Sequence, residues 1–209
     1  LSLLMHWGIV ALLWMLFRTV WPNRKIEAIQ MSLLFAVYPF FMILPFPIAY
    51  THVWFGFLAF NLSLLLMVWA TKANTYKAII LTLLATILEA AHLFTVEYFA
   101  GLEFIRVLIL WILISREEQF FSKRVKRVFF YWLPYLLIVG VFFYWRVAIY
   151  ENPPEITRNT PVVLEQLFTE PLKAIGFLIN TSLRDAFAVL TTGWQKATAV
   201  EFFNFTSPF

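Results

Sequence analysis

Long apolar runs separated by short polar segments limit this chain to very few folds. A helix needs about 20 mainly apolar residues to cross the hydrocarbon core of a bilayer. Because lipid offers no hydrogen bonds, the backbone of a spanning element must satisfy its own polar groups, as a helix does. The runs that approach this length are 1–17, 29–47, 52–70, 78–96, 99–115 and 128–148. The sequence therefore predicts an all-α fold, a polytopic transmembrane helical bundle of about six spans.

Composition supports the same class of protein. Hydrophobic residues make up 62% of the chain and charged residues only 13%, far from the average of soluble domains. The 16 Lys and Arg residues occur mainly in short clusters between apolar runs, where they meet anionic lipid headgroups, so the expected partner is the lipid bilayer and nucleic acid is not expected. The absence of cysteine excludes disulfides and thiolate sites, and three scattered histidines make a metal site improbable.

The distribution of basic residues predicts an orientation. Lys and Arg are concentrated in the segments 18–25, 72–77 and 116–127, whereas the segments 46–52 and 95–101 contain none. Loops rich in Lys and Arg remain in the cytoplasm. We therefore expect these basic segments inside, and the chain after residue 148 outside.

The character of the chain changes near residue 150, where "YENPPEITRNTP" is polar and rich in proline. Beyond it, apolar residues recur at helical spacing, which predicts a pair of amphipathic helices broken at Pro171. These helices would lie on the outer membrane surface or lead into another span. The predicted domains are a transmembrane bundle over 1–149 and an extracytoplasmic loop with interfacial helices over 150–209.

The stretch "EAAHLFTVEYFAGLEFIR" carries the strongest indication of function, because ionisable residues inside a membrane are costly and persist mainly where they are paired or functional. Glu89 and His92 are three residues apart and share one face of a helix. They form either a polar contact between helices or part of a binding site.

A second group of candidates falls at the predicted outer boundary. Glu97, Tyr98, Glu103 and Arg106 are expected to gather there, where an arginine with carboxylates and a tyrosine suits a phosphate and a polar substrate. The alternative is a self-contained ion pair between Glu103 and Arg106. His52, expected in a turn on the same side, would add a hydrogen-bond donor.

The order of segments also resembles a known family. The basic loop "RTVWPNRKIE", the proline-bearing "LPFPIAYTHVWFGFLAFNLSLLLMVWA" and "LLATILEAAHLFTVEYFAGLEFIRVLILW" are similar to the middle of polytopic bacterial glycosyltransferases of the C superfamily, which include protein mannosyltransferases and aminoarabinose transferases. The likeness covers about residues 12–145 and lies in the hydropathy rhythm and in the prolines.

This resemblance implies transfer of a sugar from a polyprenyl-phosphate carrier at the outer face of the bacterial cytoplasmic membrane, often with a divalent metal. Members of the family carry the catalytic Asp or Glu in the first outer loop, whereas Asp185 is the one aspartate of this sequence and lies far downstream. The chain reads as an internal piece of a longer protein, with the catalytic residue expected upstream. The alternative classes are a transporter or flippase, which should show broken helices in two matching halves, and a membrane scaffold.

Overall fold

The computed structural model describes residues 1–38, 47–150 and 169–198. Every regular element in those ranges is a helix and none is a strand, so the predicted all-α class is confirmed. The chain divides into two compact units, one of Leu1–Val37 with Ile43–Ile149 and the other of Tyr38–Met42 with Tyr150–Phe209. Each unit is described by itself.

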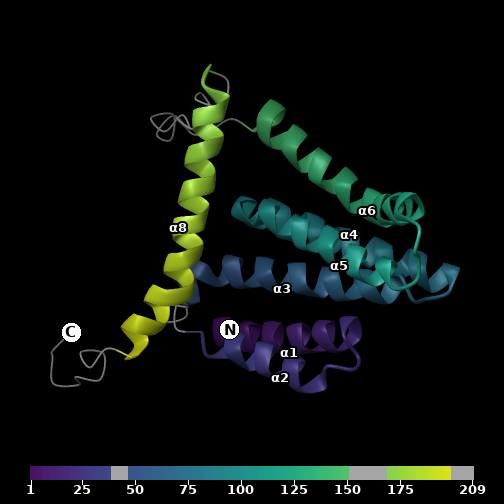
Figure 1. Cartoon of the computed structure of the whole chain (residues 1–209), viewed down its shortest axis with the longest axis horizontal. Coiled ribbons are helices and arrows are strands. Elements are labelled where there is room, and N and C mark those ends of the chain that lie inside the picture. Colours follow the sequence, from purple (N-terminus) through teal and green to yellow (C-terminus); the bar gives the residue numbers. More distant parts are fainter. Residues whose placement is uncertain (39–46, 151–168, 199–209) are drawn as a thin grey trace. The chain divides into compact units, whose positions relative to one another are not determined.

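Within each described range the helices follow one another with short connections (Figure 1). In chain order they are α1 (Ser2–Val20), α2 (Lys25–Ala36), α3 (Pro47–Ala70), α4 (Thr75–Thr95), the 3₁₀ helix η1 (Glu97–Leu102), α5 (Glu103–Ser115), α6 (Phe121–Tyr144), the π-helix η2 (Trp145–Ile149) and α8 (Pro171–Thr198).

Five segments of the described chain are long and apolar enough to cross a membrane. They are Ser2–Val20, Tyr50–Ala70, Thr75–Thr95, Glu97–Ser115 and Phe121–Ile149. The predicted run 29–47 differs, because α2 ends at Ala36 after 12 residues and residues 39–46 lie outside the described ranges. A sixth span therefore stays a prediction.

Three helix boundaries differ from the sequence-based expectation. Helix α3 begins at Pro47, so His52 lies within a helix and not in a turn, as suits a proline at the first helical position. Helix α6 begins at Phe121, which places the basic residues 123–127 in its first turns and not in a loop. The predicted run 99–115 is divided, because η1 occupies Glu97–Leu102 and α5 begins at Glu103; the chain reverses before η1 at Val96, which has an extended backbone (φ −140°).

In the first unit the helices pack largely on their sequence neighbours (Figure 1). Helix α1 packs on α2 and α3, α3 packs on α4, and α6 packs on both α4 and α5. Glycine permits two close approaches: a Cβ added to Gly8 would lie 3.0 Å from Leu58 Cδ1, and one added to Gly56 would lie 3.1 Å from Val96 Cγ2. Small residues at such contacts are typical of helices packed in membranes, where dispersion contacts hold helices together.

The interior of this unit is mainly apolar, and α3 contributes several of its buried side chains, among them Leu64, Leu65 and Val68. Large apolar side chains on the outer faces of α1, α4 and α6 are exposed, among them Leu4 and Ile87. A soluble protein would rarely present so much apolar surface, whereas a bilayer would cover it.

The basic segments meet at one end of the bundle. Lys72 Nζ donates to the carbonyl oxygen of Thr19 at 2.9 Å, and Arg116 donates to that of Val20. These are the last carbonyls of α1, which lack partners within the helix. The loops after α1, α3 and α5 therefore lie together, as the orientation rule requires of loops on one side of a membrane.

The second unit is represented mainly by α8, which has 28 residues and begins at Pro171. Leu172, Ile179, Leu183 and Leu190 follow one face of this helix and are exposed. Tyr38, which belongs to the same unit, donates its hydroxyl to the carbonyl of Val189 at 2.6 Å. The helix that the sequence predicts before Pro171 lies outside the described residues.

Candidate functional site

Arg106 is the centre of a buried polar cluster inside the first unit. Its side chain is fully buried in α5, one helical turn after Glu103. Nε donates to Glu103 Oε2 at 2.7 Å and a terminal nitrogen donates to Glu103 Oε1 at 3.1 Å. This two-point contact matches the planar guanidinium to the planar carboxylate, which makes it strong and directional.

Neighbouring helices supply the remaining partners of the guanidinium. From α3, Ser63 Oγ accepts a hydrogen bond from Arg106 at 3.2 Å and donates to the carbonyl of Ala85 at 2.7 Å. From α6, the Tyr135 ring lies beneath the guanidinium with 4.2 Å from Arg106 Cζ to the ring centroid. A desolvated cation over an aromatic face is favourable. The arginine thus connects α3, α5 and α6.

Glu89 adds a second carboxylate from α4. It is fully buried, and its Oε2 lies 3.7 Å from a terminal nitrogen of Arg106, beyond ordinary hydrogen-bond length. Two buried carboxylates, those of Glu89 and Glu103, therefore share one guanidinium. The cluster carries one negative charge in excess when both carboxylates are ionised.

His92 lies on the same buried face of α4 as Glu89, as their spacing predicts, and is itself fully buried. Its ring packs against Phe60, with centroids 5.1 Å apart, and stacks on Phe99 at 5.7 Å. Phe60 also lies under Arg106, with Cζ 5.9 Å from its ring centroid. Phe60 thus lies against both the histidine and the guanidinium.

Glu97 is not part of this cluster. Its Oε2 accepts from Arg146 Nε at 2.6 Å, which joins η1 to the π-helix η2 at the end of α6. The side chains of Glu97 and Arg146 are 46% and 29% exposed, so this pair meets the surroundings of the protein whereas the Arg106 cluster does not.

Tyr98 and His52 also lie apart from the buried cluster. Tyr98 is 83% exposed on η1, and His52 is exposed on α3. Of the residues predicted to form one outer site, the structure therefore brings Glu103 and Arg106 together and buries them, places His92 near them, and leaves Glu97, Tyr98 and His52 outside.

The geometry decides what this cluster can do chemically. An anionic ligand would have to displace Glu103 from a guanidinium that has no exposed surface. In the described structure Arg106 forms the ion pair with Glu103 that was the alternative to a phosphate site. The Arg106 side chain also contacts α3, α4 and α6. Among the described residues, no group of three or more His, Asp and Glu side chains is placed to hold a metal ion.

The sequence analysis did not identify three residues that contact the candidate site residues: Ser63 and Tyr135 at Arg106, and Arg146 at Glu97. Ser63 had a detectable signal, since a small polar residue in a spanning helix often bonds across helices. Arg146 had a stronger one, because it is a lone charge inside the predicted run 128–148. Tyr135 had none, since nothing in "LPYLL" indicates that its ring faces a cation.

No protein-family model matches this sequence, and no match is found among curated proteins or solved structures.

Proposed function

We propose that this chain is the membrane part of an enzyme that transfers a sugar from a polyprenyl-phosphate carrier at the outer face of the bacterial cytoplasmic membrane. The order of apolar and basic segments supports this reading, as do five helices able to span a bilayer. The catalytic carboxylate, and any divalent metal it uses, would belong to a part of the enzyme upstream of residue 1.

The observation that carries the proposal is the exposed pair of Glu97 and Arg146. Connectivity places η1 and η2 at the end of α4 and α6 that is remote from the basic loops, which is the predicted outer end. The carrier phosphate would bind Arg146 in place of Glu97, and not Arg106 as sequence alone suggested. The Glu97 side chain is 46% exposed, so its carboxylate can move into water and a phosphate can take its place beside Arg146.

The buried cluster has a supporting role in this proposal. Arg106 and Glu103 lie in the first turns of α5, directly after η1. Their contacts to α3, α4 and α6 fix the position of η1 and hence of Glu97. The pair therefore positions the outer site without touching the substrate.

Carrier binding to the full-length enzyme tests the assignment. Polyprenyl phosphate bound to the purified protein is quantified by native mass spectrometry, with Arg146→Gln compared to wild type. Loss of one contacting arginine should weaken binding about tenfold or more, because a charge-assisted hydrogen bond contributes roughly 1.5 to 3 kcal/mol. Arg127→Gln is the matched control, since Arg127 also pairs with an exposed glutamate, Glu117, at 2.9 Å.

Two results would contradict the assignment to Arg146. One is unchanged carrier affinity in Arg146→Gln. The other is an equal loss in Arg127→Gln, which would indicate a general effect of positive charge. The purified 209-residue chain should bind carrier but show no sugar transfer, so turnover by this chain alone would refute the upstream placement of the catalytic residue.

A transporter or flippase is the second candidate, and the excess buried carboxylate of Glu89 favours it. Ionisable residues that are not fully neutralised inside a bundle often mark an ion or proton pathway. Reconstituted vesicles distinguish the two functions: carrier movement between leaflets that is lost in Glu89→Gln would favour transport over transfer.

Orientation is tested independently by labelling single cysteines with a membrane-impermeant reagent in intact cells. Asn74 and Gln119 are exposed in turns at the basic end, and Tyr98 is exposed at the other end. Tyr98→Cys should be labelled while Asn74→Cys and Gln119→Cys are protected. The reverse pattern would place η1 in the cytoplasm and remove the proposed outer site.

A further inference from the structure

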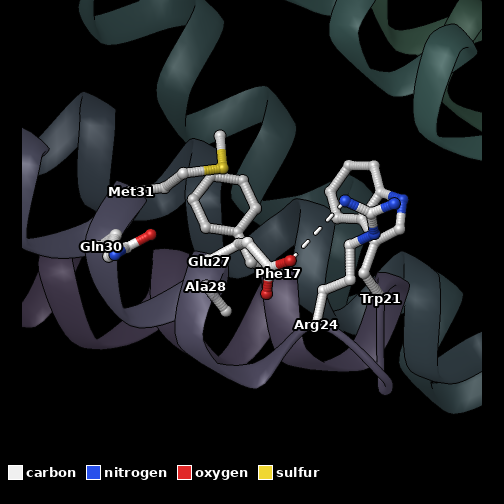
Figure 2. A pocket seen from close by; sticks show the side chains of 7 residues that line it. All are labelled: Phe17, Trp21, Arg24, Glu27, Ala28, Gln30 and Met31. Atoms are coloured by element: carbon white, nitrogen blue, oxygen red, sulfur yellow. Dashed lines mark ion pairs between the residues drawn. The ribbon is translucent and has the colours of Figure 1, made fainter.

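An open hollow of about 680 Å³ lies where the end of α1 faces the first turns of α2 (Figure 2). Phe17 lines the hollow from α1, and Trp21 lines it from the position directly after this helix. Their ring centroids are 6.2 Å apart. Ala28 and Met31 line it from α2. Its volume falls within the range of pockets that hold small molecules, about 300 to 1,000 Å³.

Polar groups gather at the same hollow. Arg24 and Glu27 line it and form an ion pair at 3.6 Å, drawn as the dashed line in Figure 2, with side chains 69% and 51% exposed. Gln30 adds an amide one turn further along α2. An exposed pair of this length contributes little to stability, so Arg24 is available to another anion.

The local field favours a negative ligand. Between residues 18 and 27 the chain carries Arg18, Arg24 and Lys25 against the single carboxylate of Glu27. The hollow also lies at the amino terminus of α2, whose first turn receives no side-chain cap, and this end of a helix attracts anions. The opposing negative end of α1 is already covered by Lys72 and Arg116.

One wall of the hollow is apolar, as a lipid requires. Phe17, Trp21 and Met31 form it, and the Met31 side chain is 51% exposed. A water-soluble anion would gain nothing from these side chains. A ligand with a phosphate and a hydrocarbon chain would use both the cationic and the apolar walls.

We propose that this hollow binds one anionic phospholipid, with its phosphate at Arg24 and an acyl chain against Phe17, Trp21 and Met31. This lipid site is independent of the proposed sugar-transfer site, because it lies at the basic end of the bundle and includes neither Glu97 nor Arg146.

Fluorescence quenching in nanodiscs tests the site with the whole chain. Nanodiscs of unlabelled phosphatidylcholine contain a minor fraction of one brominated lipid, either phosphatidylglycerol or phosphatidylcholine. The bromine atoms on its acyl chains quench nearby indoles. The signal of Trp21 is the difference between wild type and Trp21→Phe. Brominated phosphatidylglycerol should quench Trp21 more strongly than brominated phosphatidylcholine at the same fraction.

Variants identify the headgroup contact. Arg24→Gln should weaken the preference for phosphatidylglycerol about fivefold, the effect of one basic residue near anionic lipid. Arg127→Gln is the control, because it removes an equally charged residue from another basic segment whose ion pair is also exposed. The high exposure of Arg24 makes loss of folding in Arg24→Gln unexpected.

Three outcomes would overturn the proposal. Equal quenching by the two brominated lipids would mean ordinary boundary lipid. An equal effect of Arg24→Gln and Arg127→Gln would mean diffuse attraction by the whole basic end. Displacement of the lipid by excess glycerol phosphate would mean that the hydrocarbon walls contribute nothing and that the ligand is a free phosphate.

Discussion

The buried cluster allows a graded prediction, because its three charged residues differ in their contacts. Arg106→Gln leaves the carboxylates of Glu103 and Glu89 buried together without their shared cation. Breaking a buried ion pair by removing one partner destabilises a protein by about 3 to 5 kcal/mol. We expect Arg106→Gln to lower the free energy of unfolding by that amount.

The two carboxylates should differ from each other. Glu103→Gln disturbs the 2.7 and 3.1 Å contacts to Arg106, and a hydrogen bond to a charged group contributes roughly 1.5 to 3 kcal/mol. Glu89→Gln loses a 3.7 Å electrostatic contact to Arg106 and keeps an uncharged polar group beside Glu103, so it should cost less than about 1 kcal/mol. The double variant Glu103→Gln with Arg106→Gln should be more stable than Arg106→Gln alone.

Equilibrium unfolding of the purified chain in mixed micelles measures this order, with helical circular dichroism followed against the fraction of denaturing detergent. Ser63 and Tyr135 are unchanged in all variants, so differences report the charges. The reasoning would be refuted if Glu89→Gln were as harmful as Glu103→Gln, or if Arg106→Gln cost less than about 1 kcal/mol.

Further predictions concern single contacts. Gly8→Val should destabilise the bundle by about 1 to 3 kcal/mol in the same assay, because even a Cβ would lie 3.0 Å from Leu58; Gly8→Ala should cost less. Ser63→Ala should cost about 1 to 3 kcal/mol, since it removes the hydroxyl that Arg106 meets in the interior, and Ser63→Thr should retain more stability. Glu97→Gln should change stability by less than about 1 kcal/mol, because its pair with Arg146 is exposed; a larger loss would make that pair structural.

The sequence predicted the helical class well because apolar run length is a direct physical requirement of a bilayer. Its errors arise at helix ends. The sequence places Pro47 at the end of the predicted run 29–47, yet this proline begins the next helix, and proline fits both positions. The run predicted to begin at residue 99 is preceded by the 3₁₀ helix η1, and the chain reverses at Val96 with an ordinary extended backbone.

In the candidate site, only contacts between residues of the same helix were predicted from the sequence. Glu103 and Arg106 pair across one helical turn, which is readable from sequence. The contacts of Arg106 to Ser63 and of Glu97 to Arg146 join residues 43 and 49 positions apart. Such contacts depend on which helices are neighbours, and apolar runs do not encode that order.

The capping of α1 by distant cations has a consequence for how this protein is made. The carbonyl of Thr19 accepts from Lys72, which is synthesised 53 residues later, and the carbonyl of Val20 accepts from Arg116, which is synthesised 96 residues later. At about 5 to 20 residues per second of synthesis, these partners emerge roughly 3 to 10 s and 5 to 20 s after the carbonyls they bind. During that interval the end of α1 lacks these two partners, so its final contacts at this end form only after the fourth candidate segment, Glu97–Ser115, has been synthesised.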